Sequence, residues 1–377
     1  MSHTERKDAM DCSFYMPVRM LSGEGCVGAH PEVFQQLGRR CLIVTGRSGA
    51  KRSGALDDLT VLLDAAGIRW TVFDQITQNP LLSDCKRCGQ AAREFGADFL
   101  AGIGGGSPLD ATKAAAVFAA NDIPAMEVYQ RSWPNRALPF VLIGTTAGTG
   151  SEITPFAIMT VDGTGRKQSF SREDTFAAAA FCDPRYTHSL PLPFTVSTAL
   201  DAVSHAVEGY FGAKANLLSD AAALAALRQI VPTLRQMEDA RPEEVTPQQR
   251  EALYYGSLAA GMTLNHCSTC FPHTMGYFLT EQYGIPHGRA CAVYLPAYAR
   301  RGVEYLPHKA QPFLEAVGGD LESFCQELAR WNAVEFPHLT PEEIEKLLPR
   351  WEGARHFQNS PGGFTLEDAR LLLTQLF

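Results

Sequence analysis

The chain has 377 residues, of which 45% are hydrophobic and 20% are charged, as in an ordinary globular protein. Because this is long for a single compact core, we expect two domains. The 33 basic and 41 acidic residues give a formal net charge of −8, which argues against nucleic acid as the main partner. Residues 1–10 are polar and unlike a signal peptide, and no apolar run looks long enough to span a bilayer, so we expect a cytoplasmic protein without membrane contact.

Short apolar segments alternate with amphipathic ones in the N-terminal half. Residues 14–27 look like an extended segment that ends in a glycine-rich turn. The predicted strands are residues 40–45, 70–73, 99–104, 140–145 and 177–181, and the predicted helices are residues 56–66, 83–95 (with Ser83 as the cap) and 107–120. This alternation predicts an α/β domain with a Rossmann-like parallel sheet.

The pattern changes within residues 183–193, where prolines recur. No strand is predicted after this point. The predicted helices are residues 195–210, 217–237, 246–265, 271–283, 321–331, 341–348 and 366–376. We therefore expect an α/β domain of residues 1–190 and an all-α domain of residues 191–377.

A glycine-rich turn follows the predicted strand at residues 99–104. Gly104, Gly105 and Gly106 allow backbone amides to approach a ligand closely, and Ser107 opens the next helix. These amides and the positive end of the helix suit a pyrophosphate. The ordinary G-x-G-x-x-G fingerprint is absent, so a tight turn without a ligand is the alternative.

A second turn of small and hydroxyl-bearing residues follows the predicted strand at residues 140–145. It contains Thr145, Thr146 and Thr149, with glycines between them. Open α/β sheets bind ligands at the carboxyl ends of their strands, so two such turns would frame one crevice. This arrangement favours a nucleotide over a lone phosphate.

Asp201 and His205 stand one helical turn apart on a predicted helix. A carboxylate oxygen and an imidazole nitrogen on one face can hold two corners of a divalent metal site. His273 and His287 could supply the other corners. Taken alone, an Asp/His pair at this spacing is more often a surface ion pair.

Two C-x-x-C motifs, at residues 85–88 and 267–270, could suggest a four-sulfur zinc site. Their separation far exceeds that of a zinc ribbon. We therefore expect reduced thiols instead.

Four stretches, residues 104–110, 145–152, 201–209 and 273–288, resemble the iron-containing (group III) alcohol dehydrogenases of the dehydroquinate synthase-like superfamily. The resemblance covers nearly the whole chain. It implies a nucleotide-binding α/β domain followed by a helical domain, with metal and nicotinamide meeting in the cleft, and it implies a homodimer.

The resemblance also assigns site residues. The implied ligands of Fe²⁺ or Zn²⁺ are Asp201, His205, His273 and His287. Tyr277 stands where many members carry a histidine invoked in proton transfer, so it is either a relay or an aromatic lining the pocket. The implied cofactor contacts are Gly104, Gly105, Gly106, Ser107, Asp110, Thr145, Thr146, Thr149 and Lys167. Lys167 could equally be an exposed hairpin lysine.

The loop after the first predicted strand bears on the cofactor. NAD-using relatives often carry an acidic residue there, suited to a ribose hydroxyl. This chain has Gly46, Arg47 and Ser48, followed by Lys51 and Arg52, so three cations could meet a 2′-phosphate and no carboxylate would repel it. We therefore favour NADP(H) over NAD(H), with a solvated basic loop as the alternative.

The sequence thus predicts a metal-dependent alcohol dehydrogenase or aldehyde reductase that transfers a hydride between NADP(H) or NAD(H) and a small primary alcohol, diol or aldehyde. The alternatives are a dehydroquinate-synthase-like carbon–oxygen lyase, a glycerol-dehydrogenase-like polyol oxidoreductase and a non-catalytic binding protein. Apolar residues around the candidate ligands, such as Phe271 and Met275, argue against the charged substrate of the lyase. The complete ligand set argues against the other two alternatives.

Overall fold

A computed structural model describes residues 13–238 and 245–377. They form two compact units, each considered by itself. One unit contains residues 16–195 and 245–254, and the other contains residues 13–15, 196–238 and 255–377. The chain passes from one unit to the other between Thr195 and Val196, inside helix α7 (Leu192–Phe211), whereas the sequence places the boundary after residue 190.

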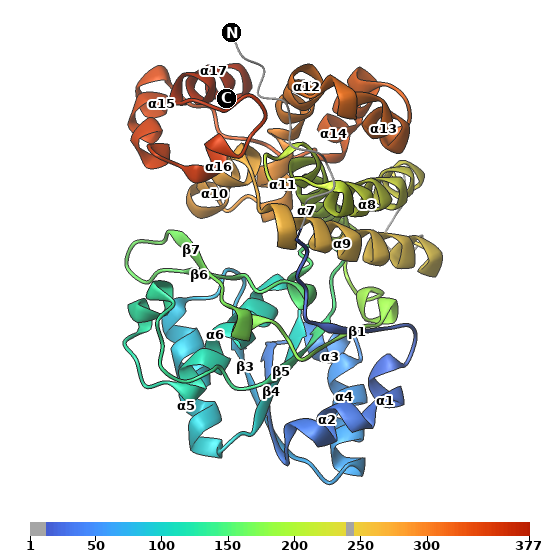
Figure 1. The fold of residues 1–377 in the computed structure, drawn as a ribbon, viewed down its shortest axis with the longest axis vertical. Coiled ribbons are helices and arrows are strands. Elements are labelled where there is room, and N and C mark those ends of the chain that lie inside the picture. Colours follow the sequence, from blue (N-terminus) through green and yellow to red (C-terminus); the bar gives the residue numbers. More distant parts are fainter. Residues whose placement is uncertain (1–12, 239–244) are drawn as a thin grey trace. The chain divides into compact units, whose positions relative to one another are not determined.

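The first unit is built on a six-stranded, fully parallel sheet, as predicted (Figure 1). The strand order is β1-β8-β5-β4-β2-β3. The strands are β1 (Arg19–Ser22), β2 (Arg40–Gly46), β3 (Arg69–Ile76), β4 (Phe99–Gly104), β5 (Phe140–Gly144) and β8 (Ala179–Cys182). Strand β1 comes from the segment expected only to be extended, and it pairs with β8 at one edge.

Helices cover both faces of this sheet because side chains alternate along each strand. Alternate residues such as Ile43 and Ala101 pack in one core with α1 (Cys26–Ala29), α2 (Pro31–Leu37) and α4 (Ala55–Ala65). On the opposite face lies α6 (Gly106–Ala120), which packs against α5 (Leu82–Phe95), and a Cβ at Gly102 would meet Thr112 of α6 at 2.4 Å. The remaining elements are α3 (Gly49–Arg52) and the hairpin of β6 (Ala157–Thr160) and β7 (Lys167–Phe170).

The order of the strands reverses at β2, since β3 lies on one side of it and β4 on the other. Ligands of open α/β sheets bind at the carboxyl ends of strands beside such a reversal. Gly46 ends β2, Gly104 ends β4, and Thr145 directly follows β5. Both predicted turns and the basic loop therefore share one edge of the sheet.

The second unit is helical throughout the residues described, as predicted. Its helices after α7 are α8 (Leu217–Gln236), α9 (Pro247–Cys267, which begins in the first unit), α10 (Phe271–Tyr283), α11 (His287–Ala292), α12 (Leu295–Tyr305), α13 (Pro307–Val317), α14 (Leu321–Trp331), α15 (Pro341–Leu347), α16 (Arg355–Gln358) and α17 (Leu366–Leu376). Residues 201–211 of α7 and Gly212, which follows the helix, are all buried. Polar side chains on this part of α7 therefore face protein rather than water.

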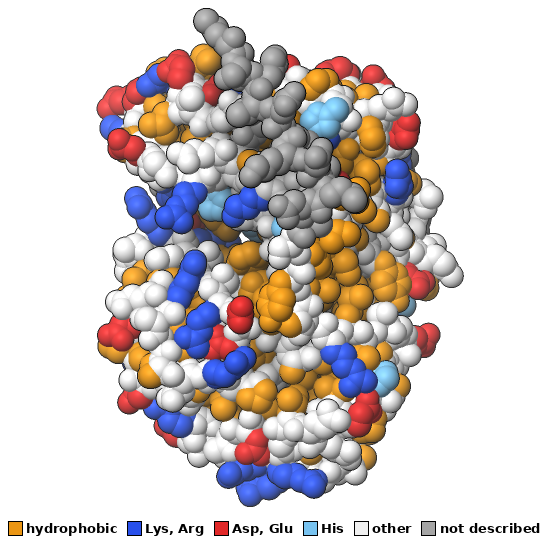
Figure 2. Space-filling view, in the orientation of Figure 1, with side chains coloured by type: hydrophobic (Ala, Val, Ile, Leu, Met, Phe, Trp, Pro, Cys, Tyr) orange, Lys and Arg blue, Asp and Glu red, His pale blue; other side chains and the backbone are white. Residues whose placement is uncertain are grey.

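Helix α8 has the length and composition of a membrane span, which corrects the expectation that no apolar run is long enough. About 44% of its most apolar window is buried inside the protein, and its Asp220 pairs with Lys309 of α13 at 2.7 Å. These contacts are those of a core helix. On the face shown in Figure 2, acidic and basic side chains are interspersed with apolar ones, as on an ordinary protein surface.

Candidate functional site

Three helices of the second unit bring the predicted metal ligands together. Helix α7 carries Asp201 and His205 one turn apart, and α10 carries His273 in its first turn. His287 is the first residue of α11. Gly288 lets α11 approach α7, because a Cβ there would lie 1.9 Å from the carbonyl oxygen of Ser197.

One carboxylate oxygen stands at the centre of the group. Oδ1 of Asp201 lies 3.9 Å from Nε2 of His205, 3.4 Å from Nε2 of His273 and 3.8 Å from Nε2 of His287. Ligand atoms bound about 2.1 Å from a tetrahedral ion stand about 3.4 Å apart. The spacing suits a divalent ion beside Asp201, although the group of donor atoms that all lie within 4.8 Å of one another contains His273 and His287 but not His205.

The burial of the group points to the same conclusion. Asp201 is 3% exposed and His273 is 2% exposed. Among the described residues, Oδ1 of Asp201 and Nε2 of His273 are buried and have no hydrogen-bond partner. These two atoms face each other as an ion pair at 3.4 Å without the geometry of a hydrogen bond, and a metal ion beside them could bind both. The residues present therefore fit the metal implied by the sequence.

Glu208 supports the group from the next turn of α7 and is fully buried. Its Oε1 lies 2.5 Å from Nδ1 of His273, and its Oε2 accepts the backbone N–H of Cys270 at 2.7 Å. The carboxylate thus orients the imidazole so that Nε2 faces Asp201, and it also lies at the positive N-terminus of α10. The sequence prediction missed Glu208, although it follows Asp201 and His205 on the same helix face.

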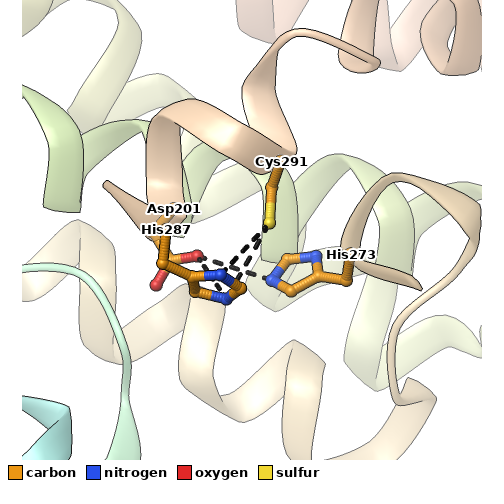
Figure 3. A group of neighbouring side chains, drawn as sticks. All are labelled: Asp201, His273, His287 and Cys291. Atoms are coloured by element: carbon orange, nitrogen blue, oxygen red, sulfur yellow. Dashed lines mark hydrogen bonds and ion pairs between the residues drawn. The ribbon is translucent and has the colours of Figure 1, made fainter. Parts of the chain in front are cut away.

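Cys291 is a second residue that the sequence prediction missed. Donor atoms of Asp201, His273, His287 and Cys291 all lie within 4.8 Å of one another, and Figure 3 shows the four side chains converging. Its Sγ lies 3.8 Å from each ring nitrogen of His287. The signal was present in the sequence, because His287 and Cys291 repeat the one-turn spacing of Asp201 and His205.

Two stacked ring pairs involve the candidate ligands. The ring of His205 stacks on that of His273, with centroids 4.6 Å apart. The half-buried Tyr277 stacks on His287, with centroids 5.3 Å apart and ring planes inclined by 9°. The predicted residue Tyr277 is therefore beside the candidate ligands.

The electrostatics of the group follow from its burial. Burial would raise the pKa of Asp201, but the facing imidazoles, His205 first and then His287 and His273, hold it well below its usual range. Burial would lower the pKa of His273, yet Cys291, Glu208 and Asp201 raise it well above the ordinary value. Both shifts favour the charged form of the group concerned.

The two predicted turns at the sheet edge of the first unit lie against each other. A Cβ at Gly105 would meet Cγ2 of Thr146 at 3.0 Å, and one at Gly106 would meet Cγ2 of Thr149 at 2.9 Å. Gly104 has a φ of +152°, which other residues rarely adopt. The absence of side chains at Gly105 and Gly106 therefore lets Thr146 and Thr149 of the second turn pack against the start of α6.

Asp110, predicted to contact the cofactor, is buried and bonded within the protein. Its Oδ1 accepts the hydroxyl of Ser151 at 2.5 Å, and its Oδ2 accepts the N–H of Ile158 at 3.1 Å. Buried Lys113 donates from Nζ to Oγ of Ser151 at 2.7 Å. Burial raises the pKa of Asp110 and lowers that of Lys113. This network joins α6 to the turn after β5 and so fixes the two turns together.

The other predicted cofactor residues are distributed around the same unit. Arg47 and Ser48 follow β2 and are exposed, as are Lys51 and Arg52 in α3. Lys167 is the first residue of β7, in the hairpin, and is half-buried. The nine described cysteines are all buried, and none forms a disulfide.

Comparison with known proteins places the chain in a family. The family model described as "Iron-containing alcohol dehydrogenase" matches residues 17–184, and the model described as "Fe-containing alcohol dehydrogenase family, C-terminal" matches residues 195–335. Sulfoacetaldehyde reductase of Bilophila wadsworthia (strain 3_1_6) is 32% identical over 82% of this chain and 80% of that protein. The 1,3-propanediol dehydrogenase of Citrobacter freundii is 32% identical over 76% of each chain.

Solved structures agree with this assignment. An iron-containing alcohol dehydrogenase from Thermotoga maritima superimposes with a TM-score of 0.88 at 37% identity, over 97% of this chain and 99% of that chain. Sulfoacetaldehyde reductase from Bifidobacterium kashiwanohense, solved in complex with NAD⁺, superimposes with a TM-score of 0.88 at 26% identity, over 97% of this chain and 99% of that chain. The chain belongs to the iron-containing alcohol dehydrogenase family.

Proposed function

We propose that the protein is a metal-dependent aldehyde reductase, or alcohol dehydrogenase in the reverse direction, that uses NADP(H) and a small primary alcohol, diol or aldehyde. The observation that carries the proposal is the oxygen of Asp201 facing three imidazole nitrogens in a buried site. In this proposal Asp201, His205, His273 and His287 hold Fe²⁺ or Zn²⁺. A divalent ion there would polarise the oxygen of the substrate, while the nicotinamide supplies or accepts the hydride.

Several relatives are named for small substrates, although another, 31% identical, is a long-chain-alcohol dehydrogenase of Geobacillus thermodenitrificans. They include a sulfoacetaldehyde reductase, a 1,3-propanediol dehydrogenase and a lactaldehyde reductase. Of the apolar residues near His273 on α10, Phe271 stacks on Phe364 and Phe278 packs edge-on against Trp351, so both belong to the core of the helical unit. We assign Tyr277 to proton relay, since a phenol hydroxyl both donates and accepts hydrogen bonds and its ring already lies against His287.

For the cofactor, we propose that the turns at Gly104–Ser107 and Thr145–Thr149 hold the pyrophosphate at the N-terminus of α6. The 2′-phosphate would lie at the loop after β2, where Arg47, Lys51 and Arg52 are exposed. We propose NADP(H) for this reason, although a relative of 26% identity was solved with NAD⁺.

The test is a steady-state comparison of NADPH and NADH in the reduction of a panel of small aldehydes. Each lost contact of a cation with the 2′-phosphate should raise the KM for NADPH about tenfold and leave that for NADH nearly unchanged. Arg47→Ala and Lys51→Ala test this, with Arg39→Ala, an exposed arginine just before the other end of β2, as the matched control. Equal KM ratios in all variants would contradict the assignment of this loop to the 2′-phosphate.

A further inference from the structure

The thiol of Cys291 is part of the same cluster as the candidate ligands, yet the family resemblance gives it no role. Its Sγ and donor atoms of Asp201, His273 and His287 lie within 4.8 Å of one another (Figure 3). Sγ lies 3.8 Å from both ring nitrogens of His287, so the sulfur lies beside this imidazole.

The backbone around Cys291 is shaped to hold the sulfur in that place. Cys291 follows His287 by one turn of α11, so both side chains leave the helix on one face. On α10, a Cβ at Gly276 would lie 2.9 Å from Sγ of Cys291 and 3.0 Å from the backbone of Ala290. A glycine at position 276 therefore allows the sulfur to lie directly against α10.

A cysteine alone does not make a metal site, but the buried ion pair of Asp201 and His273, whose facing atoms are 3.4 Å apart, is a second observation that points to a ligand here. Oδ1 of Asp201 and Nε2 of His273 are buried, lack a hydrogen-bond partner among the described residues and belong to the same cluster as the sulfur. Cys291 is itself fully buried. Burial raises the pKa of Cys291 to about 11, so this thiol would release its proton to solvent on binding the ion and become a thiolate donor.

We propose that Cys291 is a direct sulfur donor to the metal ion in the substrate-free protein, and that it favours Zn²⁺ over Fe²⁺ at this site. Thiolate is a soft ligand that suits zinc, whereas the carboxylate and imidazoles accept either ion. The inference rests on the proposed metal centre and adds one residue to it.

The test is the absorption spectrum of the protein after its metal is removed and Co²⁺ is added. A thiolate bound to Co²⁺ gives a charge-transfer band in the near ultraviolet, while any tetrahedral or five-coordinate Co²⁺ gives ligand-field bands in the visible. We expect both in the unaltered protein, and we expect Cys291→Ser to lose the near-ultraviolet band while keeping visible bands. Cys325→Ser is the matched control, because Cys325 is also buried but its Sγ contacts the carbonyl oxygen of Pro296 in another part of the helical unit.

The outcomes separate the two proposals. If the unaltered protein shows visible bands without the near-ultraviolet band, Cys291 does not bind the ion, and the metal centre itself stands. Absence of all cobalt bands would overturn the metal centre and, with it, the role of Cys291. If Cys291→Ser does not fold, X-ray absorption of the zinc-loaded unaltered protein decides the question, since a bound sulfur appears at about 2.3 Å and nitrogen and oxygen ligands alone give no such shell.

Discussion

At the scale of single residues, the site depends on carboxylates that are buried for different reasons. Asp201 faces imidazoles, whereas Glu208 faces away from the cluster and holds His273 through Nδ1. Such an outer carboxylate fixes the tautomer and the orientation of a ligating imidazole. Glu208 is therefore a positioning residue rather than a ligand.

The first prediction concerns Glu208→Gln. The amide keeps the shape of the side chain but cannot accept two bonds as an anion, so the apparent affinity for Zn²⁺ should fall about 10- to 100-fold while the fold persists. Competition with a fluorescent chelator measures the affinity, and circular dichroism checks the fold. Glu322→Gln, at an exposed pair with Arg300, serves as the control and should bind the ion normally. An unaltered affinity in Glu208→Gln would show that the carboxylate does not orient His273.

At the scale of elements, the site depends on how closely α11 approaches α7. Gly288 allows this approach, since its missing side chain leaves the carbonyl oxygen of Ser197 and the amide of Asp201 close to the backbone of α11. His287 directly precedes Gly288, so the packing of Gly288 against α7 also sets the position of His287. The position of a ligand is thus fixed by a glycine that makes no chemical contribution itself.

The second prediction concerns Gly288→Ala. The added Cβ would lie 1.9 Å from the oxygen of Ser197, so α11 must shift and carry His287 away from Asp201. Overpacking of this kind costs about 1–3 kcal/mol of unfolding free energy, and metal affinity should fall as well. Urea unfolding and the chelator competition measure the two effects. Gly28→Ala is the control, because a Cβ there meets open space; equal stability and affinity in both variants would contradict this account of the packing.

At the scale of the whole molecule, the two candidate sites belong to different units. The proposed metal ligands lie on α7, α10 and α11 of the helical unit, and the proposed cofactor residues lie at the sheet edge of the other unit. A ligand that binds only the folded form stabilises the structure that holds it, by about 2.7 kcal/mol at a concentration 100 times its Kd.

The third prediction follows from this separation. Zn²⁺ alone should slow amide hydrogen exchange in α10 and α11, and NADPH alone should slow it at the turns after β4 and β5. Mass spectrometry of exchanged peptides measures both effects on the same preparation. Protection of the sheet edge by Zn²⁺ alone, with none in α10 or α11, would contradict the assignment of the metal to the helical unit.

Much of this architecture could be predicted from sequence because periodic patterns of several turns or a full strand carry it. The strand at 99–104 and the helices at 271–283, 321–331 and 366–376 have the predicted bounds. Strand β1 has only four residues, and its pairing with β8 depends on distant chain, so local pattern does not reveal it. Ser83 was predicted to cap α5, but its hydroxyl instead donates to Asp162, a contact set by tertiary structure.

The candidate site was predictable to a similar degree. The one-turn spacing of Asp201 and His205 is visible in the sequence, whereas the meeting of α7 with α10 and α11 depends on packing. The spacing of His287 and Cys291 was also present in the sequence, whereas the contact of Glu208 with His273 depends on the packing of α7 against α10. The hydrogen bonds that Asp110 accepts could not be predicted from the sequence either, because their donors, Ser151 and Ile158, lie far along the chain.

The central claim is that this protein reduces small aldehydes only with a metal ion held by Asp201 and the three histidines. The most direct test removes metal from the purified protein under anaerobic conditions, follows NADPH oxidation with a short aldehyde such as propanal, and then adds Zn²⁺ or Fe²⁺. We expect turnover to vanish on removal and to return with one equivalent of either ion, and we expect no return in His273→Ala. Undiminished turnover in the metal-free protein, or full recovery in His273→Ala, would contradict the account.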